Sequence, residues 1–226
     1  MQPSQNLDAL LGRPRPGPLL DPPRNANGEI DYDAWEQRLS ARGIRGLPDG
    51  ELSRRIEAAR DGDRDVDAEL SLAERYADVG YHVELVLPWA EGGPIYELYS
   101  PDLRVVFPGM QPLRVDVKFR EPGKLVLKSS VNARIDHANL QIKKSREGRG
   151  DIIADCSAAA PGAIDQAEIE RYLKGKMSGN RSAPNARLGN IDYLEIIYPD
   201  HGQLKRSCML RTPMGIINGP FSEVLP

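Results

Sequence analysis

The sequence predicts an α/β protein whose mixed β-sheet is flanked by helices, with a proline-rich, partly helical extension at the N-terminus. Apolar residues at helical spacing alternate along the chain with short segments rich in β-branched residues. Near the middle, residues 100–119 form two such segments joined by a Pro/Gly-rich connector, which is typical of a β-hairpin. The expected order is helix, three strands, helix, strand, helix and two strands. A single mixed sheet accommodates this order economically.

The N-terminal segment, residues 1–64, is expected to be a tether or a delivery segment. Proline is frequent between residues 13 and 23, where it removes backbone donors and favours extended linker structure. Two short helices are expected after it, over residues 32–42 and 50–60. A charged, glycine-containing break follows, so the second domain is expected to span residues 65–226.

Composition sets limits on the kind of protein. The 226 residues suffice for a sizeable core. Residues 101–226 hold 19 basic and 14 acidic residues, a net charge of +5; since the whole chain carries −3, the first hundred residues carry −8. The basic half permits a nucleic-acid partner. No apolar run approaches the ~20 residues that span a membrane, and the basic-then-apolar order of a Sec signal peptide is missing.

The two cysteines and three histidines show no zinc-binding spacing. Cys156 ends an apolar run, where a reduced and buried thiol is expected.

The elements of the second domain are predicted from periodicity and from the residues that end each segment. The first helix is expected to end at Gly80 as its C-cap. The expected ranges are a helix over 66–79, strands over 81–87, 100–107 and 113–119, a helix over 132–146, a strand over 151–156, a helix over 165–176, a closing hairpin over 191–197 and 204–210, and loops over 89–93 and 178–187.

A carboxylate begins the apolar face of the first of these helices. Glu69 shares a row with Leu72, Ala73 and Tyr76. An ionised group at a core position costs free energy unless it is paired or binds a cation. A glutamate near a helix N-terminus is also favoured by the helix dipole. Both explanations remain open from the sequence.

The second arm of the hairpin gathers polar residues on one face. Alternation places Arg114, Asp116 and Lys118 together, opposite apolar residues, and Asp102 opens the neighbouring strand. Two carboxylates and an ammonium suit a divalent cation such as Mg²⁺ together with a phosphate. The lysine could orient the attacking water or stabilise charge on the phosphate. The alternative is an exposed Asp116–Lys118 ion pair worth ~0–1 kcal/mol.

These residues resemble the PD-(D/E)xK nuclease superfamily. There, a glutamate on the first core helix, an aspartate opening one strand and an acid-x-lysine on the next converge on a metal ion. Glu69, Pro101-Asp102 and Asp116-Val117-Lys118 match that pattern. The resemblance implies a restriction-endonuclease-like core and metal-dependent cleavage of phosphodiester bonds.

A second resemblance covers about residues 66–156 and concerns the C-terminal nuclease domains of contact-dependent growth inhibition toxins, including their tRNase branch. The matching features are Glu69, Ala73, Gly80-Tyr81-His82-Val83, Pro101-Asp102, Asp116-Val117-Lys118, Gln141-Ile142-Lys143-Lys144 and Gly148-Arg149-Gly150-Asp151. The chain departs from these domains over residues 88–94 and in its C-terminal hairpin. The resemblance implies a polymorphic toxin that acts in the cytoplasm of a target cell, favours tRNA as substrate and is held inactive by a cognate immunity protein.

The mechanism expected from this resemblance places Mg²⁺ on Asp102 and Asp116, with Glu69 as an outer or direct ligand. Lys118 would position water for in-line attack on a phosphodiester. The polar face of the helix over 132–146 would contact the substrate backbone; its residues are Arg134, His137, Gln141 and Lys144. For this face the alternative is a solvated helix surface, and the histidine could be an ordinary surface residue.

Two other functions fit the same residues. A PD-(D/E)xK DNase would use them on duplex DNA. A non-catalytic module, such as a structural part of a phage or secretion system, would not need Asp116 for any activity.

Overall fold

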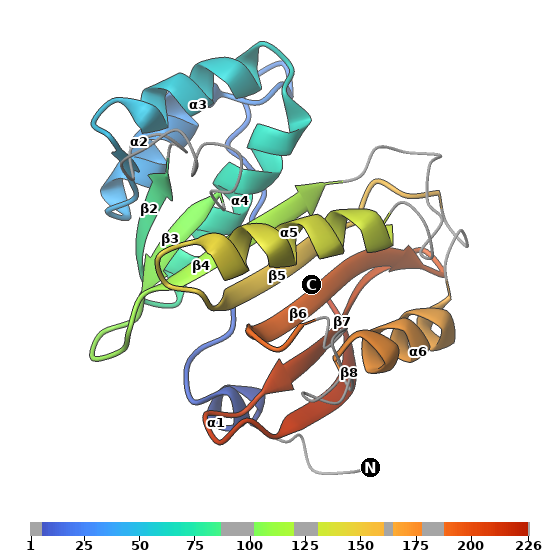
Figure 1. Cartoon of the computed structure of the whole chain (residues 1–226). Coiled ribbons are helices and arrows are strands. Elements are labelled where there is room, and N and C mark those ends of the chain that lie inside the picture. Colours follow the sequence, from blue (N-terminus) through green and yellow to red (C-terminus); the bar gives the residue numbers. More distant parts are fainter. Residues whose placement is uncertain (1–5, 87–101, 120–130, 161–164, 178–187, 226) are drawn as a thin grey trace.

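The computed structural model describes residues 6–86, 102–119, 131–160, 165–177 and 188–225 (Figure 1). The elements in chain order are α1 (Leu7–Leu11), α2 (Tyr32–Ala41), β1 (Arg45–Leu47), α3 (Glu51–Arg60), α4 (Arg64–Asp78), β2 (His82–Val86), β3 (Leu103–Val106), β4 (Leu113–Phe119), α5 (Asn132–Lys144), β5 (Gly150–Asp155), α6 (Gln166–Met177), β6 (Ile191–Asp200), β7 (Gln203–Arg211) and β8 (Ile217–Val224).

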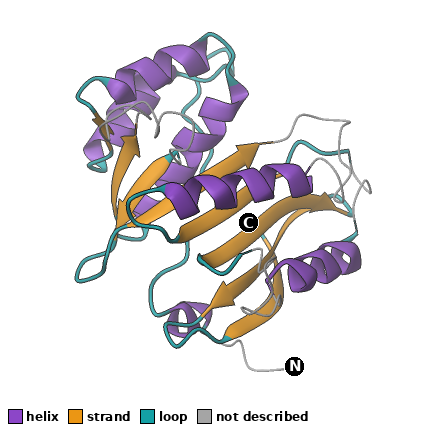
Figure 2. Ribbon diagram, in the orientation of Figure 1, coloured by secondary structure: helices purple, strands orange, loops and turns teal. Residues whose placement is uncertain are grey.

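The described strands form one eight-stranded mixed sheet in which each strand lies beside its neighbours in sequence (Figure 2). Strands β2, β3 and β4 form an antiparallel meander, and β5 and β6 then continue parallel to β4. Parallel neighbours need a crossover connection; α5 supplies it between β4 and β5, and α6 between β5 and β6. The predicted α/β class with a mixed sheet flanked by helices is therefore confirmed.

Helices cover both faces of the sheet, so the molecule has three layers (Figure 1). On one face α5 and α6 bury a cluster that includes Ile135, Ile142, Ile152 and Leu194. Helices α1 to α4 bury a larger cluster on the opposite face. No helix in the described part of the chain is long and apolar enough to cross a membrane.

Strand β4 lies between these two layers. It spans Leu113–Phe119, the range that alternation predicted. Val115 and Val117 belong to the cluster under α4. Asp116 alternates with them and pairs in register with Ile152, which lies in the cluster under α5. The polar face of β4 is thus covered by α5 rather than open to solvent.

The N-terminal segment differs from the expected tether. Strand β1 joins the sheet parallel to β2. Leu11, Trp35 and Ile56 belong to the same core cluster as the residues of α4 and β4. Arg13, predicted to lie in a linker, is buried and forms an ion pair with Asp151 on β5. The expected boundary at residue 64 therefore does not separate two hydrophobic cores.

Other element boundaries shift for local reasons. Helix α4 begins at Arg64, earlier than predicted, because the Asp63 side chain caps it by accepting from the backbone N–H of Asp65 and Val66. Strand β6 continues to Asp200, so the turn consists of His201 and Gly202. Both have positive φ, as two-residue hairpins prefer. The predicted loops over 89–93 and 178–187, and the departing segment 88–94, lie outside the described residues.

Both cysteines are buried, Cys156 at 0% and Cys208 at 1% exposure, and neither forms a disulfide. The expectation of a buried Cys156 thiol is confirmed. Burial, helped by the nearby charge of Glu195, raises the pKa of Cys208 to about 11. We expect both thiols to stay unreactive toward a thiol reagent at pH ~8 in the folded protein and to react on unfolding. Rapid labelling of Cys208 in native protein would contradict this burial.

Candidate functional site

Strand pairing places two of the predicted acids next to each other, Asp102 just before β3 and Asp116 in the middle of β4. Leu103 on β3 pairs with Val115 on β4, so the next residues along the two strands, Asp102 and Asp116, are neighbours. Asp102 fixes this end of the pair because its Oδ2 accepts a hydrogen bond of 2.9 Å from the backbone N–H of Val117. Strand pairing thus brings together two residues that lie fourteen positions apart in the sequence.

Asp116 is completely buried, with 0% exposure. A carboxylate in such a position costs free energy unless other groups stabilise it. Lys118 occupies the next position on the same face of β4, and its backbone pairs with Ala154 on β5. The side chain of Lys118 lies outside the described part of the structure.

Glu69 lies elsewhere. Helix α4 packs on the face of the sheet opposite to the one that Asp116 faces. The Glu69 carboxylate forms an ion pair with Arg55 on α3. Arg55 also pairs with Glu51 at 2.9 Å and donates a 3.0 Å hydrogen bond to the backbone oxygen of Val86 at the end of β2. The sequence left open whether this carboxylate is paired, binds a cation or is simply favoured by the helix dipole. The structure shows that it is paired with Arg55.

The three carboxylates predicted to hold Mg²⁺ consequently do not form a cluster. Among the described residues, no group of three or more His, Cys, Asp and Glu side chains is arranged to hold a metal ion. Glu69 is separated from Asp102 and Asp116 by the sheet and is held by Arg55. The residues present do not fit the three-carboxylate magnesium site that the resemblance implies.

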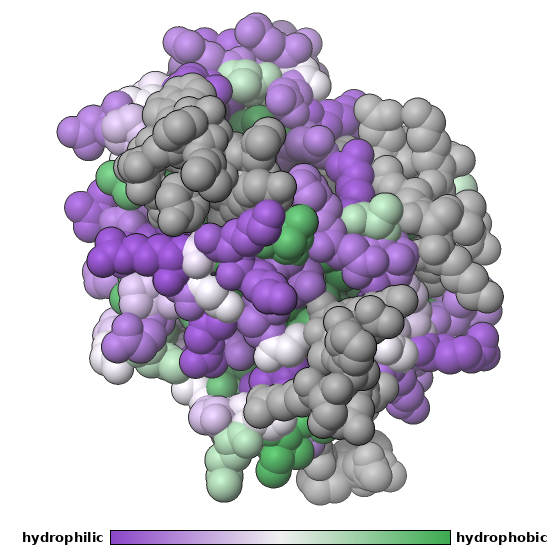
Figure 3. All heavy atoms as spheres, viewed as in Figure 1, coloured by the Kyte–Doolittle hydropathy of each residue, from purple (hydrophilic) through white to green (hydrophobic). Residues whose placement is uncertain are grey.

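The predicted polar face of α5 is present. Ile135, Ala138 and Ile142 are fully buried beneath the helix, whereas His137 and Lys144 are exposed. Figure 3 shows mainly hydrophilic side chains over this region.

At the amino end of α5, Arg134 lies 3.8 Å from Asp65 in the first turn of α4. Gln141 is partly buried. The α5 face therefore begins beside the amino end of α4 and runs along the sheet away from it.

A small pocket of about 180 Å³ lies beside the amino end of α4. It contains two carboxylates that sequence reasoning missed, Asp67 on α4 and Asp155 at the end of β5. Burial raises the pKa of Asp67, whose carboxylate also accepts from the Tyr32 hydroxyl at 3.4 Å. The missed signal for Asp155 was its place at the end of a strand parallel to β4, since parallel strands end at the same edge of a sheet.

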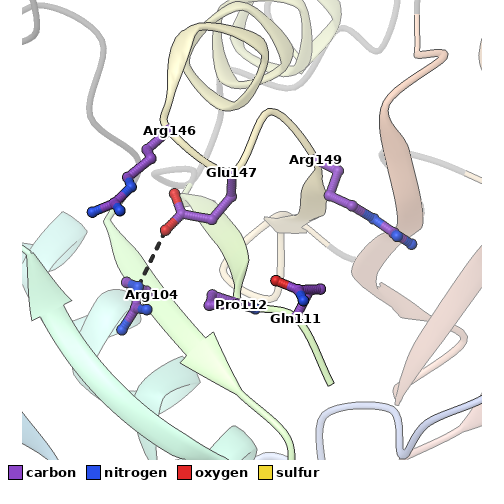
Figure 4. Close-up of a pocket in the computed structure, with 6 residues that line it drawn as sticks. All are labelled: Arg104, Gln111, Pro112, Arg146, Glu147 and Arg149. Carbon is purple, nitrogen blue, oxygen red and sulfur yellow. Dashed lines mark hydrogen bonds and ion pairs between the residues drawn. The ribbon is translucent and has the colours of Figure 1, made fainter. Parts of the chain in front are cut away.

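A larger pocket, of about 400 Å³, lies at the opposite end of β4 (Figure 4). Three arginines and one acid are among its lining residues, which are Arg104, Gln111, Pro112, Arg146, Glu147 and Arg149. Arg104 pairs directly with Arg114 across β3 and β4. Like charges at paired positions are unfavourable, and the Glu147 carboxylate offsets them by binding Arg104 at 3.1 Å and Arg114 at 2.5 Å. The hairpin register could have predicted from the sequence that Arg104 and Arg114 lie opposite each other. It could not have predicted their partner Glu147, which lies in the loop that follows α5.

Glu147 provides a pH-dependent test of this network. Burial alone would raise the pKa of Glu147, but the hydrogen bond and the charge of Arg114 lower it by more. The pKa of Glu147 in the folded state therefore lies below the ordinary 4.5. Ionised Glu147 therefore stabilises the fold above that pH, and this stabilisation is lost as the pH falls through the folded-state pKa. At neutral pH we expect Glu147→Gln to lower the free energy of unfolding by about 1–3 kcal/mol. Urea unfolding well below pH 4.5 should show a smaller difference, and an equal difference at both pH values would contradict the assignment.

Comparison of the chain with protein-family models, with curated proteins and with solved structures found no match. The function therefore has to be inferred from the fold and from the residues themselves.

Proposed function

We propose that this protein is a nuclease that hydrolyses phosphodiester bonds, and that it serves as the tRNA-cleaving toxin domain of a bacterial competition system. The observation that carries the proposal is the position of Asp102 beside Asp116-Val117-Lys118 on paired strands. The order of the elements also supports the proposal, since Asp102 comes just before β3 and Asp116-Val117-Lys118 lies on β4, the next strand.

In this proposal the reactive centre consists of Asp102, Asp116 and Lys118. The Lys118 ammonium orients the attacking water and stabilises charge that develops on the phosphate. A neighbouring carboxylate accepts a proton from that water as its oxygen bonds to phosphorus. The P–O bond to the leaving oxygen breaks in the same step, and solvent protonates the leaving oxygen. Glu69 stabilises the junction of α3 and α4 through Arg55 instead of joining the centre. The substrate backbone lies along the α5 face, where it meets Arg134, His137, Gln141 and Lys144.

A non-catalytic binding module is the second candidate, and one observation favours it. Asp116 is completely enclosed. A carboxylate can act on a substrate or on water only if that substrate or water can reach it. If the buried acid only supports the fold, Asp116→Asn will change stability but no measurable activity. The nuclease proposal expects the same variant to lose cleavage.

Inducible expression in bacteria tests the proposal. Wild type is compared with Lys118→Ala and with Lys174→Ala, which removes an exposed lysine from α6 and serves as the matched control. The tRNA and the chromosomal DNA are then inspected on gels. Fragmented tRNA with wild type and the control, and intact tRNA with Lys118→Ala, would support the tRNase. Degraded DNA with intact tRNA would support the DNase alternative, and toxicity with both nucleic acids intact would contradict a nuclease.

The same cleavage assay tests whether a divalent cation is required and whether an immunity protein blocks the activity. Cleavage by purified protein in the presence of EDTA, with and without added Mg²⁺, measures whether a divalent cation is required. As a toxin, the protein acts in the cytoplasm of a target cell and is blocked by a cognate immunity protein. Co-expression with that protein should restore growth and protect the tRNA.

A further inference from the structure

The basic pocket at the start of β4 is separate from the proposed reactive centre. On β4, Arg114 is two residues from Asp116, roughly 7 Å along the strand, and four residues from Lys118, roughly 13 Å. Figure 4 shows the Glu147 side chain pointing toward Arg104 and Arg146, while Arg149 extends away from these three residues. A volume of about 400 Å³ falls within the range of small-molecule sites.

The positive charges of this pocket exceed the negative ones. Glu147 is shared between Arg104 and Arg114, and Glu84 binds Arg104 at 2.7 Å. Arg149 is bound to Asp192 through Nε and Nη2 at 2.9 and 2.7 Å, and about half of its side chain stays exposed.

Within the described residues, Arg146 is exposed and forms no ion pair. Burial, together with the charge of Arg146, lowers the pKa of Arg114. An anion in the pocket would therefore relieve an existing repulsion.

Backbone and side-chain hydrogen bonds hold the frame around these arginines. The loop after α5 is held to β4 because the backbone N–H of Arg114 donates to the backbone oxygen of Arg149 at 3.2 Å. The Ser145 hydroxyl donates to the Ile142 oxygen at 2.7 Å and accepts from the N–H of Gly148 at 3.4 Å. The backbone oxygen of Arg114 also leaves no room for a Cβ at position 150, so only glycine permits this close approach. A pocket fixed in this way binds without first ordering its loops.

We propose that this pocket binds a phosphate group. Arginine forks match the oxygens of phosphate, and arginine is weakly hydrated enough to release water on binding. Arg104 and Arg146 supply guanidinium groups beside Glu147, and Arg149, which lines the pocket but is bound to Asp192, adds positive charge. The phosphate is carried either by a free nucleotide or by a polynucleotide, and the site does not depend on cleavage at the other end of β4.

Arg146 is the residue to change, because it is exposed and its removal breaks no ion pair within the described structure. Binding is measured by calorimetry on the full chain at constant ionic strength, with inorganic phosphate, with AMP and with a short single-stranded oligonucleotide. The oligonucleotide is tested in a Lys118→Ala background so that it is not cleaved. Arg60→Gln is the matched control, since Arg60 is an exposed arginine on α3 that pairs with Asp33.

We expect Arg146→Gln to weaken phosphate binding about tenfold and Arg60→Gln to change it less than twofold. Weaker binding of phosphate and AMP by Arg146→Gln would identify a small-molecule site. An effect confined to the oligonucleotide would identify a polynucleotide phosphate. The proposal is overturned if wild type binds none of the three probes, or if Arg146→Gln binds them all like wild type. Circular dichroism and the unfolding midpoint of Arg146→Gln show whether a loss of binding comes from misfolding.

Discussion

Replacement of Asp151 by alanine should lower the free energy of unfolding by about 3–5 kcal/mol, because it leaves a buried guanidinium without its counter-charge. Asp151 is fully buried on β5 and lies 2.5 Å from Arg13, whose side chain is 2% exposed. The Tyr76 hydroxyl donates to the other oxygen of Asp151 at 2.6 Å. Tyr81 accepts from Arg13 at 3.1 Å and donates to the backbone oxygen of Pro14. Removal of the Asp151 carboxylate therefore disrupts the hydrogen-bonded group of Arg13, Tyr76 and Tyr81. Urea unfolding of wild type and Asp151→Ala measures the loss of stability.

An exposed ion pair provides the control. Arg60 and Asp33 lie 2.6 Å apart, close to the separation of the buried pair, but their side chains are 50% and 79% exposed. Asp33→Ala should cost at most about 1 kcal/mol. If Asp151→Ala costs no more than Asp33→Ala, the N-terminal segment is not anchored through Arg13. Arg13→Ala should lose comparable stability, since it leaves the Asp151 carboxylate buried without its cation.

This network shows which part of the fold the sequence could predict. Local patterns gave the helices and the central strands, because alternation and helical periodicity depend on neighbouring residues. The anchoring of Arg13 depends on a partner 138 positions away, and a proline-rich segment of similar composition could equally have remained a linker.

The missed strands have related causes. Strand β1 has three residues and no alternating pattern. Strand β8 contains Gly219 and Pro220, which argue against a strand in sequence and are tolerated because β8 lies at the edge of the sheet.

The candidate site was predictable to a smaller extent. Hairpin register could place Asp102 next to Asp116, and the pairing of Leu103 with Val115 in the structure agrees with this register. The burial of Asp116 could not be foreseen, since α5 covers the polar face of β4 and the position of α5 is set by packing against β5. The partner of Glu69 could not be foreseen either, because Arg55 comes from α3, which sequence analysis assigned to a separate segment.

The Lys118→Ala variant should reduce the rate of phosphodiester cleavage by about 10²–10⁴-fold, the range associated with loss of a positioned catalytic group. The expected loss is in kcat more than in KM, because in the proposed mechanism the ammonium acts on charge that develops only in the transition state. Single-turnover cleavage of purified tRNA measures this change. Lys118→Arg, which keeps the charge, should retain more activity than alanine. Equal unfolding midpoints for the three proteins would show that the fold is intact.

Glu69→Gln separates the arrangement implied by the resemblance from the one found in the structure. If Glu69 holds the catalytic cation, the Glu69→Gln variant should lose activity as severely as Lys118→Ala. A glutamate that is held by Arg55 between α3 and α4 should instead lower the free energy of unfolding and leave the rate per folded molecule within a few-fold of wild type. A severe loss of rate at unchanged stability would contradict the arrangement in which the sheet separates Glu69 from Asp102 and Asp116.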